Sequence, residues 1–301
     1  MKTTGKLLLL IFIIININSC TTKGELGTES NPIKMYFVPS MEAGKVVTSG
    51  KAIAAGLEKL TGYKFKIAVP TNYAAVIEAM GTNQADIGWL PTFAYILANQ
   101  KYQAQVALTT VRNGLEKYRG QFVVRADSGI KNLQDINGKV IAYTDASSTS
   151  GYIYPSAQLK MNNIKPDKYY FAGGHPQTIL AVYQGSADVG CSYWSPPQNN
   201  EPQDARKAVL DTYPDIMEKV IPIAFTDWIP NDTVTFRKGI DDEMKSRIVD
   251  ALLEFASSEQ GHAVLYELYS VDNFVKSSDS DYDIVRKSLE TLGFGAEEFV
   301  K

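Results

Sequence analysis

Histidine, cysteine and long apolar runs are scarce in this chain of 301 residues. Only two histidines, His175 and His262, and two cysteines, Cys20 and Cys191, are present. Transition metals are held by clustered histidine, cysteine or carboxylate side chains, so we expect no metal site, and we expect no other cofactor. The sequence also lacks the G-x-S-x-G turn that presents the nucleophile of many hydrolases. These absences make an enzyme a poor candidate.

An excess of basic charge is absent as well. The chain has 30 basic and 33 acidic residues, a formal net charge of −3 and no basic stripe. Proteins that hold nucleic acid carry such a stripe or patch. We therefore expect no nucleic-acid partner.

The single long apolar run covers residues 7–15 and follows Lys2 and Lys6. It is shorter than the roughly 20 residues of a membrane-spanning helix, so it predicts a signal peptide over 1–19. The stretch 17–20 (INSC) resembles a bacterial lipobox. We expect Cys20 to be acylated, with palmitate among its lipids, and to anchor the chain to a membrane through a polar tether over 20–32. The alternative is an ordinary secreted protein in which Cys20 has no role.

Short β-rich runs alternate with helical stretches along the rest of the chain. The expected strands are 34–39, 63–69, 85–89, 105–112, 120–125, 139–144, 169–172, 187–192 and 221–225. The expected helices are 42–60, 72–80, 92–99, 132–136, 154–162, 177–184, 241–257, 259–269 and 282–293. This order predicts mainly parallel sheets with helices on both faces.

The βα pattern starts twice, which predicts two α/β lobes joined by two crossovers. Lobe 1 would consist of 33–122 and 235–301, and lobe 2 of 123–234, with hinges near 122–125 and 230–235. Ligands of open α/β sheets bind beyond the carboxyl ends of the strands. In such a clamshell this position is the cleft between the lobes.

The strongest local motif covers 145–155 (DASSTSGYIYP), between an expected strand and an expected helix. Pro155 favours a first helical turn, so Ser148, Thr149, Ser150 and Gly151 lie at the helix start. Backbone N–H groups there lack partners within the helix and, with the helix dipole, favour an anion. The hydroxyls add donors, so the motif predicts an oxyanion site. The alternative is a single serine that caps the helix within a polar loop.

A second motif, 173–176 (GGHP), also joins an expected strand to an expected helix. His175 can donate a hydrogen bond to an anion from this position, although most isolated histidines are structural or lie on the surface. Ser40 and Thr92 also follow expected strands and are weaker candidates for donors. For His262, within a late helix, we expect no specific role.

These motifs together resemble the phosphonate-binding, PhnD-like family of ABC transporter receptors. The resemblance runs from about residue 33 to 295 and rests on the following stretches: 72–77 (NYAAVI), 85–90 (ADIGWL), 148–151 (STSG) with Pro155, 174–175 (GH), 187–189 (ADV), and 229–233 (IPNDT) followed by Arg237. It implies a type II periplasmic-binding-protein clamshell that binds a ligand without chemistry. It also implies an ABC transporter permease as partner, an extracytoplasmic location in the periplasm or on the outer face of the cytoplasmic membrane, and a monomer.

The resemblance implies a ligand site with parts from both lobes. Its residues are the cradle Ser148, Thr149 and Ser150, the donor His175, the cleft tyrosines Tyr73 and Tyr118, and the acidic Asp232. The match at Tyr118 is weaker, because the neighbouring residues differ from the family pattern. Our hypothesis is that Asp232 accepts a hydrogen bond from a P–OH group, or from an ammonium group of the ligand, and thereby helps to reject sulfate.

One position departs from the family pattern. Receptors for aminoalkylphosphonates carry a glutamate where this chain has Ser195, and serine brings no charge for an amine. Tyr193 and Trp194 would narrow the cleft, unless they only pack under a loop. We infer a small ligand: phosphite, methylphosphonate, hypophosphite or phosphate. The alternatives are a sulfonate or a phosphate ester, or a phosphate-ester hydrolase in which Ser150 acts with His175.

Overall fold

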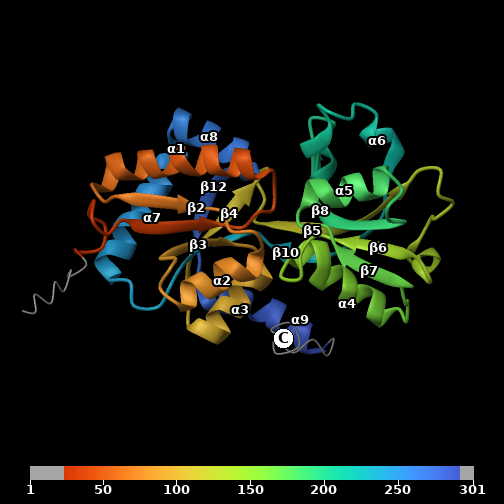
Figure 1. Ribbon diagram of the computed structural model, residues 1–301, viewed down its shortest axis with the longest axis horizontal. Coiled ribbons are helices and arrows are strands. Elements are labelled where there is room, and N and C mark those ends of the chain that lie inside the picture. Colours follow the sequence, from red (N-terminus) through yellow and green to blue (C-terminus); the bar gives the residue numbers. More distant parts are fainter. Residues whose placement is uncertain (1–23, 292–301) are drawn as a thin grey trace, which may run out of the picture.

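The computed structural model describes residues 24–291, which form two α/β lobes side by side, each around its own sheet (Figure 1). The signal peptide and Cys20 expected from the sequence lie outside these residues. Of the expected tether, the described part lies against lobe 1, where the Gly27 carbonyl accepts a hydrogen bond from Lys64 N–H at 2.8 Å. Within 24–291, no helix has both the length and the apolar character needed to cross a membrane.

Lobe 1 is built on a six-stranded sheet in the order β12-β4-β11-β3-β1-β2. Its strands are β1 (Ile33–Phe37), β2 (Phe65–Ala68), β3 (Ile87–Leu90), β4 (Gln105–Arg112), β11 (Thr233–Phe236) and β12 (Val271–Lys276). Its helices are α1 (Ala43–Thr61), α2 (Tyr73–Gly81), α3 (Thr92–Tyr102), α7 (Asp242–Ser257), α8 (Glu259–Tyr269) and α9 (Asp283–Thr291). One apolar cluster joins the sheet to α1, α7 and α8, and a second joins it to α2, α3 and α9.

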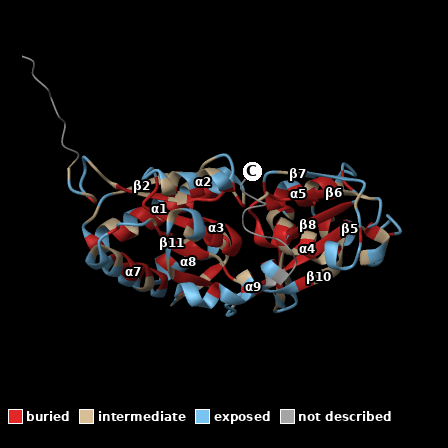
Figure 2. Ribbon diagram, turned by 90° about the horizontal axis from the view of Figure 1, so that it is seen from below, coloured by how far each residue is buried: buried red, intermediate tan, exposed pale blue. Residues whose placement is uncertain are grey.

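Lobe 2 has a second sheet in the order β10-β5-β8-β6-β7, with β9 paired to β8. Its strands are β5 (Lys117–Arg125), β6 (Val140–Tyr143), β7 (Lys168–Phe171), β8 (Val189–Gln198), β9 (Glu201–Asp204) and β10 (Val220–Pro230). Its helices are α4 (Tyr154–Met161), α5 (His175–Tyr183) and α6 (Ile216–Lys219), with short 3₁₀ turns at 133–136 and 205–209. In both lobes the buried residues follow the strands and the inner helix faces (Figure 2).

Local sequence signals explain where several helices begin and end. The Asn72 side chain accepts a hydrogen bond from Ala75 N–H and caps α2, and Asp241 caps α7 in the same way. Helix α1 ends at Gly62, which has a φ of 75° and therefore adopts the left-handed conformation that favours glycine. Such signals lie within a few residues of one another, so the sequence alone predicts these ends closely.

The expectation of mainly parallel sheets was wrong, because both sheets are mixed. In lobe 1, β1 pairs with β2 and β3 in parallel, whereas β11 pairs antiparallel with β3 and β4. In lobe 2, β6 pairs with β7 and β8 in parallel, whereas β5 pairs antiparallel with β8 and β10. The antiparallel strands flank the two crossovers, where the chain leaves one sheet and enters the other.

The two crossovers run beside each other and are tied by Asn231. Its backbone N–H donates to the Glu116 carbonyl at 2.9 Å, and its side-chain amide donates to the carbonyls of Thr110 and Leu115 at 2.9 and 2.7 Å. The first crossover links β4 to β5 and the second links β10 to β11. The lobe boundaries expected at 122/123 and 234/235 fall inside β5 and β11, since a strand's own residues do not show which sheet it joins.

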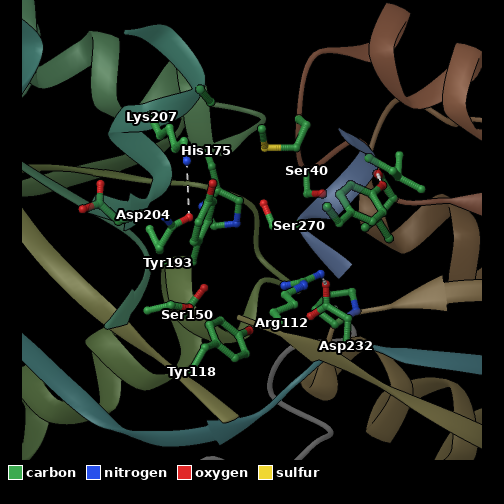
Figure 3. A pocket seen from close by; sticks show the side chains of 18 of the residues that line it. Ser40, Arg112, Tyr118, Ser150, His175, Tyr193, Asp204, Lys207, Asp232 and Ser270 are labelled. Carbon is green, nitrogen blue, oxygen red and sulfur yellow. Dashed lines mark hydrogen bonds and ion pairs between the residues drawn. The ribbon is translucent and has the colours of Figure 1, made fainter. Parts of the chain in front are cut away.

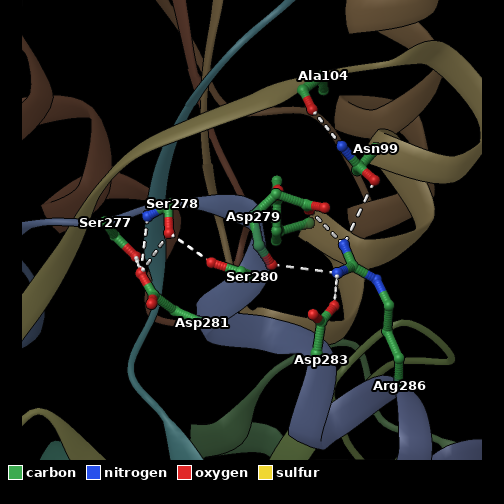
Figure 4. A network of polar contacts seen from close by, with 10 residues as sticks. Asn99, Ala104, Ser277, Ser278, Asp279, Ser280, Asp281, Asp283 and Arg286 are labelled. Atoms are coloured by element: carbon green, nitrogen blue, oxygen red, sulfur yellow. Dashed lines mark hydrogen bonds and ion pairs between the residues drawn. The ribbon is translucent and has the colours of Figure 1, made fainter.

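The last described helix, α9, packs on lobe 1. Figure 4 shows the polar network that holds it: the Arg286 guanidinium bonds to Asp283 at 2.8 Å, to Asn99 at 3.3 Å and to Asp279. Tyr95 of α3 also donates to Asp279. These contacts attach α9 and the turn before it to α3.

Candidate functional site

A cavity of about 260 Å³ lies between the lobes. Its lining includes six of the seven ligand residues expected from the sequence: Tyr73, Tyr118, Ser148, Ser150, His175 and Asp232. They come from both lobes and from the second crossover, and they are separated by up to 159 positions in the sequence. The structure therefore brings together residues that the sequence connects only through family resemblance (Figure 3).

The cradle motif forms the start of a helix, as its sequence predicted. A π-type turn, Thr149–Ile153, leads directly into α4, and the Ser148 hydroxyl oxygen accepts a hydrogen bond from Gly151 N–H at 3.1 Å. A Cβ on Gly151 would lie 2.3 Å from the Thr144 hydroxyl oxygen, so only glycine permits this packing. Within 24–291, the N–H groups of Thr149 and Ser150 have no hydrogen-bond acceptor. These free donors at a helix start are suited to an anion.

Thr149 is the expected ligand residue that does not line the cavity. Its hydroxyl oxygen accepts a hydrogen bond from Phe93 N–H at 2.8 Å, in the first turn of α3 in the other lobe. Pro91, the residue before α3, has no side chain that can cap this helix. The Thr149 hydroxyl therefore caps a lobe 1 helix from lobe 2, which family resemblance did not predict.

His175 opens α5 and reaches the cavity with one edge of its ring. Its Nδ1 lies 2.7 Å from the Ser192 hydroxyl and 3.2 Å from the Thr144 hydroxyl, both buried, so the Nε2 edge is the one left to the cavity. Burial, with the charge of Arg112 as a second cause, lowers the pKa of His175 to about 3. The imidazole is therefore neutral at physiological pH and carries one N–H donor.

The hydroxyl groups around His175 indicate which nitrogen carries that proton. Each hydroxyl has a single hydrogen, and Thr144 donates its hydrogen to the Cys191 carbonyl at 3.1 Å. The Ser192 hydroxyl has no acceptor other than Nδ1 among the described residues. A Ser192 to Nδ1 hydrogen bond satisfies both groups and leaves Nε2–H to donate into the cavity.

Tyr73 and Tyr118 place phenol groups in the cavity from opposite lobes. Both rings are buried, and burial, followed by nearby carboxylates, raises the pKa of each tyrosine well above its ordinary value. They stay protonated and can serve as neutral donors. No hydrogen bond joins Ser150 to His175 among residues 24–291.

Asp232 has a partner that sequence reasoning missed. Arg112, the last residue of β4, bonds to the Asp232 carboxylate at 2.6 Å, and their side chains are only 13% and 17% exposed. Figure 3 shows the two together on the lobe 1 side of the cavity. The position of Arg112 at the carboxyl end of an expected strand was a signal that could have identified it.

On the lobe 2 side, the cavity is also lined by Ser195 and by Gln203, Asp204 and Lys207 of the following segment. The Asp204 carboxylate forms a two-pronged pair with Arg206 at 3.0 and 2.7 Å. Tyr193 lines the cavity and packs edge-on to His175, whereas Trp194 packs on Phe225 at 4.6 Å and does not line it. Ser40 lines the cavity too, whereas Thr92 donates instead to the Pro230 carbonyl.

Two α/β lobes, two crossovers and a polar cavity between them define a type II periplasmic-binding-protein clamshell. Residues 35–282 match the family model described as "ABC transporter, phosphonate, periplasmic substrate-binding protein". The chain belongs to this family, whose members are binding components of transporters and not enzymes. The expected fold and the resemblance drawn from the sequence are thereby confirmed.

Individual relatives support the same placement. The chain is 29% identical over 220 residues to the phosphonates-binding periplasmic protein of Escherichia coli, which covers 70% of this chain and 62% of that protein. It is 29% identical over 175 residues to the phosphate-import protein PhnD of Mycolicibacterium smegmatis, which covers 54% of each. The chain thus matches between about half and three fifths of the length of these curated relatives.

Solved structures share the fold at lower identity. A binding protein component of an ABC phosphonate transporter from Pseudomonas aeruginosa has a TM-score of 0.77 at 21% identity and 87% coverage of both chains. PhnD1 of Prochlorococcus marinus in complex with methylphosphonate has a TM-score of 0.76 at 15% identity, covering 87% of this chain and 98% of that one. At these identities the likeness establishes the fold alone.

Proposed function

We propose that this protein is the extracytoplasmic receptor of an ABC importer and binds a small phosphonate- or phosphite-type oxyanion between its lobes. The observation that carries the proposal is the cluster of neutral donors at one end of the cavity. It combines the free N–H groups of Thr149 and Ser150 with the hydroxyls of Ser148 and Ser150 and with the His175 ring. Fixed dipoles of this kind stabilise an anion without net positive charge.

Binding is coupled to closure of the lobes. Three hydrogen bonds join lobe 2 to lobe 1 beside the cavity: Phe93 N–H to Thr149, His175 N–H to the Ser40 carbonyl at 3.2 Å, and Tyr73 N–H to Asp145 at 3.4 Å. A ligand that touches Tyr73 from lobe 1 and the cradle from lobe 2 has both sets of contacts only when the lobes are closed. It therefore favours the closed state, which the permease would receive.

The size and lining of the cavity favour a small ligand. Its volume of about 260 Å³ is just below the usual range of roughly 300–1,000 Å³ for small-molecule sites. Ser195 offers no charge for an amine, and Arg206 already pairs with the nearby Asp204 carboxylate. Phosphite, methylphosphonate, hypophosphite and phosphate fit this lining better than an aminoalkylphosphonate. In this scheme Asp232 accepts a hydrogen bond from the P–OH group of phosphite, methylphosphonate or phosphate, whereas hypophosphite has no P–OH group at neutral pH and lacks this bond.

We also propose that Cys20 anchors the protein by a lipid to the outer face of the cytoplasmic membrane or in the periplasm, where a monomer meets the permease. The lipobox-like stretch 17–20 supports this part of the proposal. Metabolic labelling with an alkyne palmitate analogue tests it. Label on the wild-type chain and none on Cys20→Ser would support acylation, and equal label on both would exclude it at this residue.

Isothermal calorimetry tests the ligand. The purified chain, in mild detergent that keeps any lipid anchor in solution, is titrated with phosphite, methylphosphonate, 2-aminoethylphosphonate, phosphate and sulfate in one buffer. We expect phosphite or methylphosphonate to bind most tightly and sulfate not to bind. A preference for 2-aminoethylphosphonate would contradict the role given to Ser195, and no heat with any phosphorus oxyanion would contradict the proposed function.

A further inference from the structure

Among the ion pairs of the described residues, the buried pair of Arg112 and Asp232 is the one whose two members both line the cavity. Arg112 Nη2 lies 2.6 Å from Asp232 Oδ2, and the guanidinium also lies 5.8 Å from the Tyr269 ring centre. Arg112 Nε is buried and has no hydrogen-bond partner among the described residues. Both residues line the cavity in which the oxyanion is proposed to bind.

Asp232 by itself would oppose that function. A carboxylate beside a bound anion repels it, and the repulsion is strong where water is excluded. The other cations of the lining, Lys45 and Lys207, are exposed at the rim, where solvent and salt screen them. His175 is neutral. Arg112 is therefore the cation placed to balance the charge of Asp232.

We propose that Arg112 is a specificity-determining residue, which balances the Asp232 carboxylate so that the cavity accepts an oxyanion carrying one proton. The P–OH group of the ligand donates to Asp232, and its remaining oxygens accept from the cradle and His175. Sulfate and sulfonates have no such proton at neutral pH, so one of their oxygens would face the carboxylate. This inference rests on the proposed function and specifies the protonation state of its ligand.

The chain offers a matched control for the loss of a buried arginine. Arg237 bonds to Asp86 at 2.8 Å, with side chains 17% and 2% exposed, and neither residue lines the cavity. Removing Arg237 leaves an unpaired carboxylate in lobe 1 without changing the charge of the cavity. Any effect of Arg112→Met on binding that Arg237→Met lacks therefore comes from the cavity and not from general loss of stability.

Calorimetry with methylphosphonate and sulfate on the full chain tests the inference, with circular dichroism to confirm folding at the chosen temperature. We expect Arg112→Met to weaken methylphosphonate binding by at least about 30-fold. The double variant Arg112→Met/Asp232→Asn should regain about tenfold of this loss, because the unbalanced charge is gone. Asp232→Asn alone should bind sulfate at least about tenfold more tightly than the wild type, and Arg237→Met should bind like the wild type.

The outcomes separate this inference from the function on which it rests. A wild type that binds methylphosphonate, with an Arg112→Met variant within twofold of it, would overturn the inference alone. So would a double variant that binds no better than Arg112→Met, or an Asp232→Asn variant that still excludes sulfate. A folded wild type that binds no phosphorus oxyanion would overturn both.

Discussion

The two sides of the cavity meet the proposed ligand with different chemistry. The helix start at Ser148–Ser150 and the His175 ring, both in lobe 2, present groups without net charge. The lobe 1 side presents the ion pair of Arg112 and Asp232 together with the Tyr73 phenol. The difference teaches that neutral dipoles can supply the affinity for an anion, while a balanced ion pair opposite them can decide which anion is accepted.

The largest effect on ligand binding is expected from Gly151→Ala, which displaces the neutral donors at the helix start of lobe 2. The new methyl group would lie 2.3 Å from the Thr144 hydroxyl oxygen and 2.9 Å from the Ser148 hydroxyl oxygen, so the helix start must shift. Overpacking of this kind costs about 1–3 kcal/mol of folding free energy, and a displaced cradle should abolish measurable oxyanion binding by calorimetry. Gly44→Ala is the control, because its methyl group would meet only the flexible Glu42 carboxylate. Binding by Gly151→Ala at wild-type affinity would show that the cradle is not the site.

Lowering the pH should lower the free energy of unfolding, because His175 of lobe 2 is buried as a neutral ring. The pKa of His175 in the folded protein is about 3 because of burial, below the ordinary value of 6.5, so the unfolded chain takes up the proton first. The stability from this group is complete above pH 6.5 and is lost as the pH falls toward 3, by up to roughly 1.4 kcal/mol per pH unit. Urea unfolding between pH 6.5 and 4.5 should show a shallower decline for His175→Asn than for the wild type. Equal slopes in the two proteins would contradict this account.

Ser192→Ala tests whether the Ser192 hydroxyl determines which nitrogen of the His175 ring carries the proton. This hydroxyl contacts the ring but does not line the cavity. Without Ser192 to donate to Nδ1, the Nε2–H form should lose population, and oxyanion binding should weaken by about tenfold. With only two histidines in the chain, ¹⁵N spectra of histidine-labelled protein report the His175 tautomer directly, and His262→Asn assigns the signals. An unchanged tautomer in Ser192→Ala would remove this role from Ser192.

Thr149→Val should have a smaller effect, because it breaks a contact between the two lobes and leaves the cradle N–H groups in place. Phe93 N–H would lose its acceptor, and loss of a helix cap costs about 0.5–2 kcal/mol. We expect binding to weaken by about two- to thirtyfold, mainly through faster ligand release, as measured by stopped-flow fluorescence. Thr149→Ser keeps the hydroxyl and should bind like the wild type. If both variants lose affinity equally, the threonine methyl group matters and not the cap.

Lys207→Gln should have the smallest effect on ligand affinity. Lys207 lies at the rim of the cavity and belongs neither to the neutral donors of lobe 2 nor to the ion pair of Arg112 and Asp232. Lys207 is exposed, and its nearest polar partner is Gln203 at 3.5 Å. Mutation of a rim charge mainly changes association rates and their salt dependence, so the affinity should stay within about twofold at physiological salt. A loss of affinity above tenfold would show that the charge on which binding depends lies at the rim and not at Arg112 and Asp232.

The sequence predicted most elements of the fold and missed a definable group. Strand β4 and helix α8 have the predicted bounds, Gln105–Arg112 and Glu259–Tyr269. The strands β9, β11 and β12 were not predicted. Two of these have four residues, too few for a periodic pattern to emerge. Strands β11 and β12 pair antiparallel with β4, which lies far earlier in the chain, whereas β9 pairs antiparallel with β8 directly before it.

For this protein, the local order of residues determined the alternating α/β elements and the strand-end motifs that carry the cradle and His175. Caps, glycines and prolines act within a few residues, so they can be identified without a structure. Only the tertiary structure decided that Arg112 pairs with Asp232, 120 positions away, and that the Thr149 hydroxyl accepts a hydrogen bond from Phe93 N–H and does not line the cavity. Such pairs depend on which groups the two crossovers and the closed lobes bring within hydrogen-bond distance, and no local pattern encodes that distance.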